Sequence, residues 1–421
     1  MKVYPLETIL ATAKELSPYY NQLYKDVDLQ NVELSGIPLT VQDDYWEMMS
    51  GFNMGVLTGE MTDGIVFKSG GTTGNPKFTV YTKQEWATMT EVFGYHQALN
   101  KFRKGDRVAN LFYVGELYSS FLFLHDSMRN CTEDVIIFPI AGSAPKDFIY
   151  HAMHDLKIDT VLVVPTTILN LAEWIHENNL DPLKIKKVYF GGETMYPDQR
   201  EILSSFFPGV EIRSIGYASV DGGLLGFCDE SCGFNEHRIF DGYNIIELIN
   251  EDTGEVIDET GVEGKMHTTN LSRLLMPVIR YPIGDMGVWK EPLGSKNRKF
   301  EIKGRSEECA RFGPVSLYFE DIRKILGNYI HDLKISNYQM IIDHTEGKDK
   351  LTIKIASETD TEKCKKYDSE IINTIETQRA LIKEEKEAGK IHPIEISWVD
   401  SEGIQINPRT GKLKRIIDNR F

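Results

Sequence analysis

The chain has 421 residues, of which 41% are hydrophobic and 26% are charged, so it is expected to fold into a globular protein, and its length predicts two domains. The net charge of −16 argues against non-specific nucleic-acid binding, and five cysteines, without a paired framework, indicate a reducing compartment. Charged residues and Pro interrupt the N-terminal segment and no apolar run reaches the length of a bilayer, so we expect a cytoplasmic protein with no signal peptide and no membrane contact.

The first predicted strand, Gly64–Phe67, runs into a glycine- and hydroxyl-rich loop with the sequence KSGGTTGNPK. Glycines allow backbone N–H groups to converge on an anion, while hydroxyls and Lys77 add donors and a positive charge. The spacing does not match a Walker A loop, because Asn75 or Pro76 stands where the second Gly is required. We therefore predict a polyphosphate site of another architecture, with an ordinary Gly/Thr turn as the alternative.

Strand-like and helix-like segments then alternate through the first two-thirds of the chain. Thr160–Val164 and Lys187–Phe190 have the apolar pattern of buried strands, and Thr167–His176 and Pro197–Phe206 have the pattern of helices. This rhythm predicts a parallel sheet with helices on its faces. Ligand sites in such sheets lie at the carboxyl ends of the strands. We therefore expect the loops that follow these strands to contribute to a ligand site.

The pattern changes past residue 305. Leu351–Ala356 alternates as a half-solvated strand, Ser369–Ala388 is expected to be one long helix, and Ile394–Val399 another strand. A domain of about a hundred residues with this α+β pattern is of ordinary size. We therefore predict domains at 1–304 and 305–421.

Four further segments carry polar groups in turn-like or loop-like contexts. They are SIGYASVD (214–221), RYPIGD (280–285), KGRSEE (303–308) and NPRTGKLKR (407–415). Together with the opening loop, and in this order, they resemble the adenylate-forming superfamily of acyl-CoA synthetases, peptide-synthetase adenylation domains and luciferases. The segments SPYYNQLYKDVD, IPLTVQDDYW, DLKIDTVLVVPTTILNLAEW, VYFGGETMYPDQ and TTNLSRLLMPVIRYPIGD resemble its phenylacetate–CoA ligase branch.

The resemblance covers nearly the whole chain and implies a fold. That fold is of the α/β class, with a large N-terminal domain of parallel and mixed sheets flanked by helices, which binds ATP and the carboxylate. A small, mobile C-terminal α+β domain carries the catalytic lysine.

The resemblance also implies roles for individual residues. The nucleotide-binding residues would be Ser69, Gly70, Gly71, Thr72, Thr73, Gly74, Lys77, Gly192, Glu193, Tyr217, Asp285 and Arg305. Lys412 would bridge the substrate carboxylate and the α-phosphate, and Glu307 would be the hinge. Asp221 stands where the family has a Glu that reaches Mg²⁺.

A carboxylate that attacks an α-phosphate approaches another anion, so cations must offset the repulsion. The implied reaction is ATP-dependent activation of a carboxylic acid to an acyl-adenylate, followed by transfer to coenzyme A with release of AMP. The cofactors would be ATP, Mg²⁺ and coenzyme A. A carrier-protein thiol or an amine is the alternative acceptor. A nucleotide-binding protein that has lost catalysis is a further alternative, because Val220 and Asp221 depart from the family pattern.

The acid-binding pocket would be formed by Tyr113, Glu116 and Ala218, the first two in the aromatic-rich segment Asn110–Tyr118. Flat aromatic walls favour an aryl or arylacetic acid, and Glu116 offers an alternative role in recognising an amino or hydroxyl substituent. The sequence leaves the oligomeric state open, with a homodimer among the options.

Cys228, Cys232 and His237 have nearly the spacing of zinc ligands. In members of this branch with a structural zinc, a further Cys-x-Cys precedes the hinge, but the corresponding segment here, Glu291–Arg298, has no cysteine. We therefore favour reduced cysteines over a zinc site.

Overall fold

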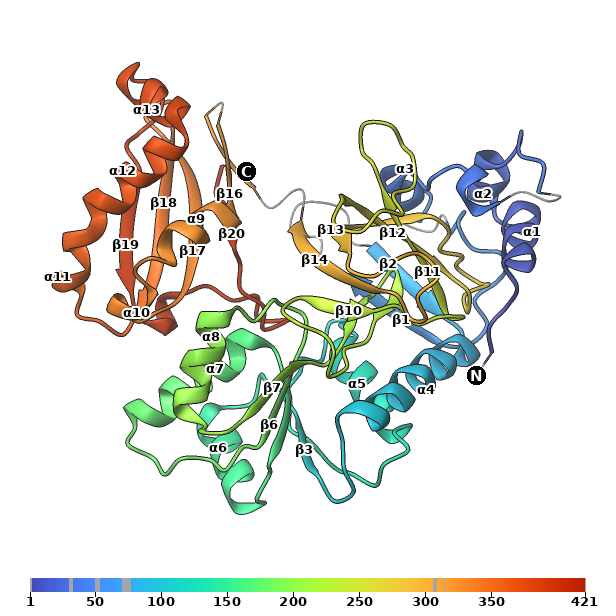
Figure 1. Cartoon of the computed structure of the whole chain (residues 1–421), viewed down its shortest axis with the longest axis horizontal. Helices are drawn as coiled ribbons and strands as arrows, with labels where there is room; N and C mark the ends of the chain where they lie inside the picture. Colours follow the sequence, from blue (N-terminus) through green and yellow to red (C-terminus); the bar gives the residue numbers. More distant parts are fainter. Residues whose placement is uncertain are drawn as a thin grey trace. The chain divides into compact units, whose positions relative to one another are not determined.

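The computed structural model describes residues 2–29, 33–49, 54–69, 77–305, 309–313 and 315–420. The chain divides into two compact units, coloured along the sequence in Figure 1. Unit 1 comprises Met1–Val164, Leu183–Thr194 and Gly209–Ser306, and unit 2 comprises Pro165–Pro182, Met195–Pro208 and Glu307–Phe421.

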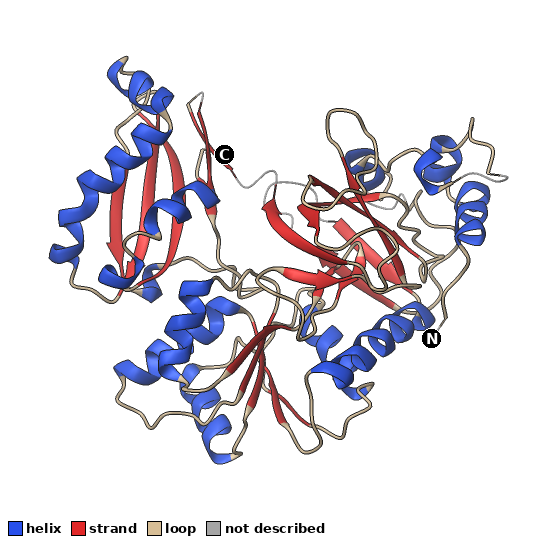
Figure 2. Ribbon diagram, in the orientation of Figure 1, coloured by secondary structure: helices blue, strands red, loops and turns tan. Residues whose placement is uncertain are grey.

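Unit 1 contains a five-stranded parallel sheet with the order β4-β3-β5-β6-β7, whose strands are red in Figure 2. Its strands are β3 (Arg107–Asn110), β4 (Ile136–Pro139), β5 (Thr160–Val163), β6 (Lys187–Phe190) and β7 (Glu211–Ser214). All four residues of β5 are buried, as expected for the centre of a parallel sheet. The predicted strands near residues 160 and 187 are thus confirmed.

A second sheet of unit 1 is antiparallel, with the order β10-β14-β13-β12-β11. Its strands are β10 (Glu236–Arg238), β11 (Asn244–Ile249), β12 (Glu263–Asn270), β13 (Tyr281–Trp289) and β14 (Lys299–Arg305). Two antiparallel pairs complete the strands of the unit: β1 (Ile65–Ser69) with β2 (Lys77–Tyr81), and β8 (Tyr217–Ser219) with β9 (Gly223–Gly226).

Unit 1 also contains helices, and aromatic side chains contribute to its apolar core. The helices are α1 (Leu6–Leu16), α2 (Pro18–Leu23), the short 3₁₀ helix η1 (Leu34–Gly36), α3 (Gln42–Glu47), α4 (Lys83–Asn100), α5 (Ser120–Arg129) and α6 (Lys146–Asp155). Helix α4 begins with a capping box, in which the Glu85 N–H donates to Thr82 Oγ1 and the Thr82 N–H donates to Glu85 Oε2. One apolar core contains Tyr45 and Tyr281, together with residues of α1 and α2.

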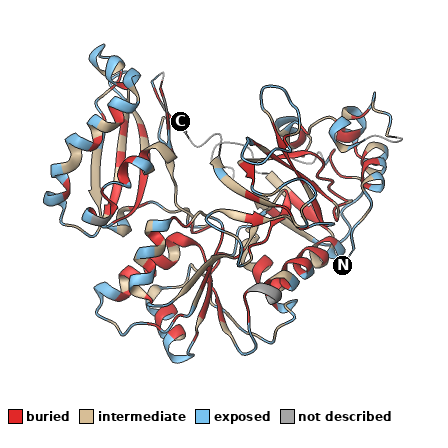
Figure 3. Cartoon of the chain, viewed as in Figure 1, coloured by how far each residue is buried: buried red, intermediate tan, exposed pale blue. Residues whose placement is uncertain are grey.

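Unit 2 is built on a four-stranded mixed sheet with the order β19-β18-β17-β20. Its strands and those of a separate hairpin are β15 (Cys309–Phe312), β16 (Val315–Tyr318), β17 (Ile335–Thr345), β18 (Lys348–Ser357), β19 (Glu395–Val399) and β20 (Ile416–Asp418). Figure 3 shows buried residues along its central strands, where Met340, Leu351 and Ile353 form a core with helical residues such as Ile322 and Ile371.

The helices of unit 2 come from three parts of the chain. They are α7 (Pro165–Glu177), α8 (Pro197–Phe206), α9 (Phe319–Leu326), α10 (Ile330–Leu333), α11 (Thr361–Cys364), η2 (Lys365–Tyr367), α12 (Asp368–Gln378), α13 (Ala380–Glu387) and η3 (Ser401–Gly403). Gln199 of α8 donates to the Ser336 carbonyl at 3.2 Å and to Asn337 Oδ1 at 3.2 Å. Unit 2 thus combines α7 and α8, which precede residue 304, with the C-terminal segment. The division of the chain into domains at residue 304 stays a prediction.

The expectation of one helix over Ser369–Ala388 is wrong. The segment forms α12 and α13, which are separated at Arg379, where φ is −130° and ψ is 70°. The Arg379 guanidinium pairs with Asp321 of α9 and lies 5.7 Å from the Tyr318 ring, so a tertiary ion pair accompanies the break. In the rest of the architecture, parallel and antiparallel sheets combine with helices, which confirms the predicted α/β class.

Candidate functional site

Three of the predicted nucleotide-binding residues lie together in unit 1. The Tyr217 phenol, at the start of β8, donates a hydrogen bond to the Asp285 carboxylate on β13. Asp285 is paired with Arg305 in the register of β13 and β14. The Tyr217 ring packs near His237 and Phe300, with centroid separations of 5.7 Å and 6.1 Å. An aromatic ring and a carboxylate from two different sheets therefore adjoin, as adenine stacking and ribose binding require.

The predicted metal-binding acid, Asp221, is held by both its backbone and its side chain. Its carbonyl oxygen accepts a 2.7 Å hydrogen bond from Arg273 Nη1, and its Oδ2 accepts a 2.9 Å hydrogen bond from the Tyr281 phenol. Arg273 is fully buried and lies 4.3 Å from the Tyr81 ring. Tyr81 in turn donates to the Val220 carbonyl at 2.7 Å. The position of Asp221 is therefore set by groups from three other segments of the chain.

The Tyr281 hydroxyl is itself the centre of a hydrogen-bond cluster. It accepts hydrogen bonds from Trp46 Nε1 and Gln42 Nε2, both at 2.8 Å. Burial, and secondarily the charge of Asp221, raises the pKa of Tyr281 well above its ordinary value, so the phenol keeps its proton. Sequence reasoning did not assign these three residues a role, although Gln42 and Trp46 lie in the quoted segment IPLTVQDDYW and Tyr281 in RYPIGD.

The predicted phosphate loop is described only at its two ends. Ser69, the last residue of β1, is paired with Lys77, the first residue of β2. Lys77 Nζ lies 5.4 Å from the centroid of the Trp46 ring. The predicted sites Gly70, Gly71, Thr72, Thr73 and Gly74 lie outside the described residues. Lys77 and Asp221 are therefore both adjacent to the Trp46–Tyr281 pair.

The remaining predicted residues of unit 1 lie after β3, after β6 or on β8. Gly192, with φ +82°, and half-buried Glu193 follow β6, at the carboxyl edge of the parallel sheet. Tyr113 is buried, whereas Glu116 and Ala218 are exposed. The role of each in nucleotide or acid binding stays a prediction.

The three candidate zinc ligands have other partners. His237 is buried, its Nε2 shares a 2.9 Å hydrogen bond with Ser214 Oγ, and burial lowers its pKa to about 3. A hydrogen bond between the two thiols lowers the pKa of Cys228 and raises that of Cys232. Within the described ranges, no three His, Cys, Asp or Glu side chains are grouped so as to hold a metal.

In unit 2, Lys412 lies beside a tight turn near the C-terminal end of the chain. The turn is closed by the Asn407 N–H, which donates to the Lys412 carbonyl at 2.7 Å, and Gly411 has φ +66°. Gln339 of β17 donates to the carbonyls of Gln405 and Lys414, both at 2.7 Å. The Lys412 side chain is half-buried. The predicted hinge residue, Glu307, lies outside the described residues.

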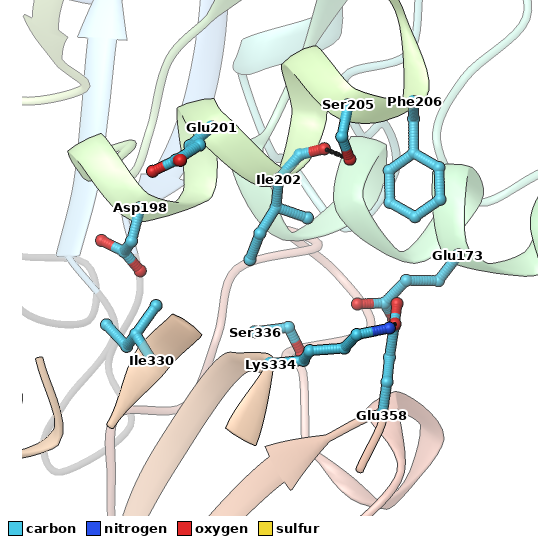
Figure 4. Close-up of a pocket in the computed structure, with 10 residues that line it drawn as sticks. All are labelled: Glu173, Asp198, Glu201, Ile202, Ser205, Phe206, Ile330, Lys334, Ser336 and Glu358. Carbon is cyan, nitrogen blue, oxygen red and sulfur yellow. Dashed lines mark hydrogen bonds and ion pairs between the residues drawn. The ribbon is translucent and has the colours of Figure 1, made fainter. Parts of the chain in front are cut away.

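A cavity of about 240 Å³ lies within unit 2 (Figure 4). Its wall carries four carboxylates, Glu173, Asp198, Glu201 and Glu358, and one lysine, Lys334, which pairs with Glu358 at 3.3 Å. Burial raises the pKa of Glu173. An acidic wall disfavours an anionic nucleotide or carboxylate, and none of the predicted site residues lines the cavity. We therefore assign neither substrate to it.

Comparison with known proteins places this geometry in context. No protein-family model matches the chain. The chain is 26% identical over 430 residues to a phenylacetate–coenzyme A ligase of Aromatoleum evansii, covering 97% of this chain and 91% of that protein. It is 27% identical over 365 residues to an indoleacetate–lysine synthetase of Pseudomonas savastanoi, covering 83% of each.

Among solved structures, a 2-hydroxyisobutyryl-CoA ligase in complex with its acyl-adenylate superimposes with a TM-score of 0.77 at 17% identity, over 99% of this chain and 88% of that one. The chain thus has the fold of the adenylate-forming enzymes. Its sequence is similar to those of phenylacetate–coenzyme A ligases, as the ordered motifs predicted. In the part of the chain that the structure describes, no helix combines the length and apolarity needed to cross a bilayer.

Proposed function

We propose that the protein activates a carboxylic acid with ATP to form an acyl-adenylate, and then transfers the acyl group to coenzyme A with release of AMP. The observation that carries the proposal is the grouping of Tyr217, Asp285 and Arg305, through a side-chain hydrogen bond and a strand pairing, in a chain that resembles such ligases along almost its whole length. In this proposal Tyr217 stacks on adenine, Asp285 accepts hydrogen bonds from the ribose hydroxyls, and Arg305 contacts the nucleotide. A ligand hydroxyl would compete with the Tyr217 phenol for the same carboxylate.

The phosphates would be bound by the loop that includes Ser69 and Lys77, with Gly192 and Glu193 bordering the adenine. Lys77 supplies a cation at the end of that loop. The family's Mg²⁺ suits Asp221, because Mg²⁺ is commonly held by one or two carboxylates with substrate phosphates and water rather than by an all-protein cage. When bound, the ion would neutralise phosphate charge. The sequence supplies one acid here and the surrounding hydrogen bonds fix it.

Lys412 would bridge the substrate carboxylate and the α-phosphate. Its place beside a closed turn limits the freedom of the backbone that carries it. We further propose that residues 305–421 form a small domain that turns about Glu307 between the two half-reactions. Hinges of this kind use a few loop residues to absorb a large change in backbone angles.

The acid itself is proposed to be aryl or arylacetic. Tyr113 and Phe112, both buried, offer flat aromatic surfaces after β3. Glu116 is exposed on the same segment and would recognise a polar substituent of the acid. The proposed partners are thus a small carboxylic acid and coenzyme A.

A second acceptor is favoured by one observation. The similarity to an indoleacetate–lysine synthetase covers 83% of the chain, which is more than the 59% and 67% covered by two of the phenylacetate–coenzyme A ligases. An amine would attack the same acyl-adenylate that a thiol attacks, so the adenylation half would be unchanged. Omitting coenzyme A distinguishes the acceptors, because AMP release that is equally fast without it, and rises on adding an amine, rejects coenzyme A as the acceptor.

The adenylation half is tested by carboxylate-dependent ATP–pyrophosphate exchange across a panel of acids. Lys412→Ala should lower the exchange rate by about a hundredfold or more, because a preorganised cation at the reacting anions is lost. Lys414→Ala is the matched control, since it removes a cation two residues away and should leave the rate within about threefold of the wild type. Absence of exchange with every acid, in the wild-type protein, would refute catalysis and leave a nucleotide-binding protein. A response to long fatty acids alone would refute the aromatic-acid proposal.

A further inference from the structure

Three segments that are distant in sequence meet at the Tyr281 hydroxyl, and a fourth contacts the Trp46 ring. Gln42 and Trp46 come from α3, Tyr281 begins β13, Asp221 follows β8, and Lys77 begins β2. Trp46 Nε1 and Gln42 Nε2 donate to the Tyr281 oxygen at 2.8 Å, and that oxygen donates to Asp221 Oδ2 at 2.9 Å. We refer to Gln42, Trp46 and Tyr281 as the phenol cluster.

The hydrogen-bond inventory of the phenol fixes its direction. A tyrosine hydroxyl has one proton to donate and two lone pairs that accept. Both lone pairs of Tyr281 are engaged by N–H donors, since the Trp46 indole can only donate and the Gln42 amide contributes its nitrogen. The only hydrogen-bonding capacity left to the hydroxyl is its proton, which is therefore donated to Asp221. The carboxylate oxygen is thus held by a donor that has no alternative acceptor within the cluster.

The cluster holds one oxygen of the carboxylate and leaves the other for a ligand. Within the described part of the chain, Asp221 Oδ1 accepts no hydrogen bond, while Oδ2 accepts from Tyr281 and the backbone carbonyl accepts from Arg273. Asp is one methylene shorter than Glu, so its distance to a bound ion depends more strongly on the hydrogen bonds that fix the side chain. Loss of a hydrogen-bond partner of a metal-binding group typically lowers metal affinity by about 10- to 100-fold.

Trp46 connects the same cluster to the phosphate loop. Lys77 Nζ lies 5.4 Å from the centroid of the Trp46 ring, within the range of a cation–π interaction. The indole thus contacts a cation with its face and the phenol with its N–H. Tyr281 is 1% exposed, and its ring packs against Tyr45 at 5.3 Å, so the platform is rigidly packed from behind.

We propose that Tyr281, fixed by Trp46 and Gln42, is a positioning residue that sets Asp221 for a divalent cation, and that Trp46 positions Lys77 in the same assembly. The inference rests on the proposed function, because it concerns the metal and phosphates of that site. In this proposal the phenol cluster fixes the metal-binding acid and a phosphate-binding cation relative to each other, although Asp221 lies in the turn after β8 and Lys77 begins β2.

The test measures metal affinity rather than turnover. Mn²⁺ is titrated into the full-length protein in the presence of α,β-methylene-ATP, which cannot form an adenylate, and free Mn²⁺ is followed by its electron paramagnetic resonance signal. Tyr281→Phe keeps the ring and removes the hydroxyl, and it should weaken Mn²⁺ binding by about 10- to 100-fold. In steady-state assays the Mg²⁺ requirement should rise while the KM of the carboxylic acid stays within about threefold.

Tyr45→Phe is the matched control. It removes a hydroxyl from the same aromatic core, where Tyr45 donates to the Pro277 carbonyl at 3.0 Å, and it should leave Mn²⁺ binding within about threefold of the wild type. If Tyr281→Phe does not fold, Trp46→Phe provides the second measurement. It removes one donor from the phenol and the indole face from Lys77, and it should weaken Mn²⁺ binding several-fold.

The outcomes separate this inference from the proposed function. If the wild type catalyses pyrophosphate exchange and Tyr281→Phe binds Mn²⁺ as tightly as Tyr45→Phe does, the positioning role is refuted and the proposed function stands. If the wild type shows neither exchange nor nucleotide-dependent Mn²⁺ binding, both are refuted. A loss confined to Tyr281→Phe and Trp46→Phe supports the proposal.

Discussion

The buried ion pair between Arg280 and Glu247 should be one of the most sensitive points of unit 1. The two side chains are only 4% and 8% exposed, and they form two hydrogen bonds of 3.0 Å and 2.9 Å. Arg280 also donates to the carbonyls of Ser35 at 3.1 Å and of Ile37. It directly precedes Tyr281, so this pair anchors the start of the strand that carries Tyr281.

Removing one partner leaves a charge without its counter-ion in the interior. Glu247→Leu should lower the free energy of unfolding by about 3–5 kcal/mol, because the guanidinium cannot lose its proton and keeps only backbone carbonyls as partners. Arg280→Met leaves the Glu247 carboxylate without its counter-ion, but this carboxylate can become neutral by taking up a proton. The same variant also removes the hydrogen bonds to two backbone carbonyls, and each of these bonds contributes about 1 kcal/mol or more. The double variant should cost less than the sum of the single variants by at least about 2 kcal/mol.

The assay is urea unfolding followed by tryptophan fluorescence at pH 7, for the wild type, both single variants and the double variant. Lys104→Met serves as the control, because Lys104 and Asp134 also lie 3.0 Å apart but are 81% and 80% exposed. Exposed pairs contribute about 0–1 kcal/mol, so this variant should unfold near the wild-type midpoint. If the effects of the two single variants add up to that of the double variant, or if Glu247→Leu is as stable as the control, the buried ion pair does not stabilise the protein in this way.

Two further predictions concern stability. Burial lowers the pKa of Lys101 to about 8, so between about pH 8 and pH 10.4 the unfolded chain binds more protons than the folded chain. The free energy of unfolding of the wild type should therefore rise with pH in that window, by up to about 1.4 kcal/mol per pH unit relative to Lys101→Met. Equal pH slopes of the two proteins in urea titrations would contradict this prediction. A Cβ on Gly94 of α4 would lie 2.3 Å from the Ser127 carbonyl oxygen, whereas one on Gly59 would meet nothing within 4 Å. Gly94→Ala should therefore destabilise the protein by about 1–3 kcal/mol despite alanine's higher helix propensity, Gly59→Ala should not, and equal thermal midpoints for the two variants would refute the packing argument.

Local pattern was sufficient for much of the secondary structure. The predicted bounds of the Lys187–Phe190 strand and the Pro197–Phe206 helix are those of β6 and α8. Both segments carry a clear apolar period between breaking residues, and such periods are local properties of the chain. The helix over Ser369–Ala388 was wrong because its break at Arg379 coincides with an ion pair to Asp321, a residue 58 positions away, which no local period records.

The sequence by itself predicted the class of protein, because ordered short motifs are a property of the chain that does not depend on folding. It also determined that Tyr217, Asp221 and Asp285 are candidates, since each lies in such a motif. Only the tertiary structure decided that the Tyr217 phenol meets Asp285, and that Asp221 is held through Tyr281 by Gln42 and Trp46. These contacts join residues 68, 60 and up to 239 positions apart. A hydrogen bond depends on distance and direction in space, and the pairing of distant strands and helices that supplies both is absent from any one segment of the sequence.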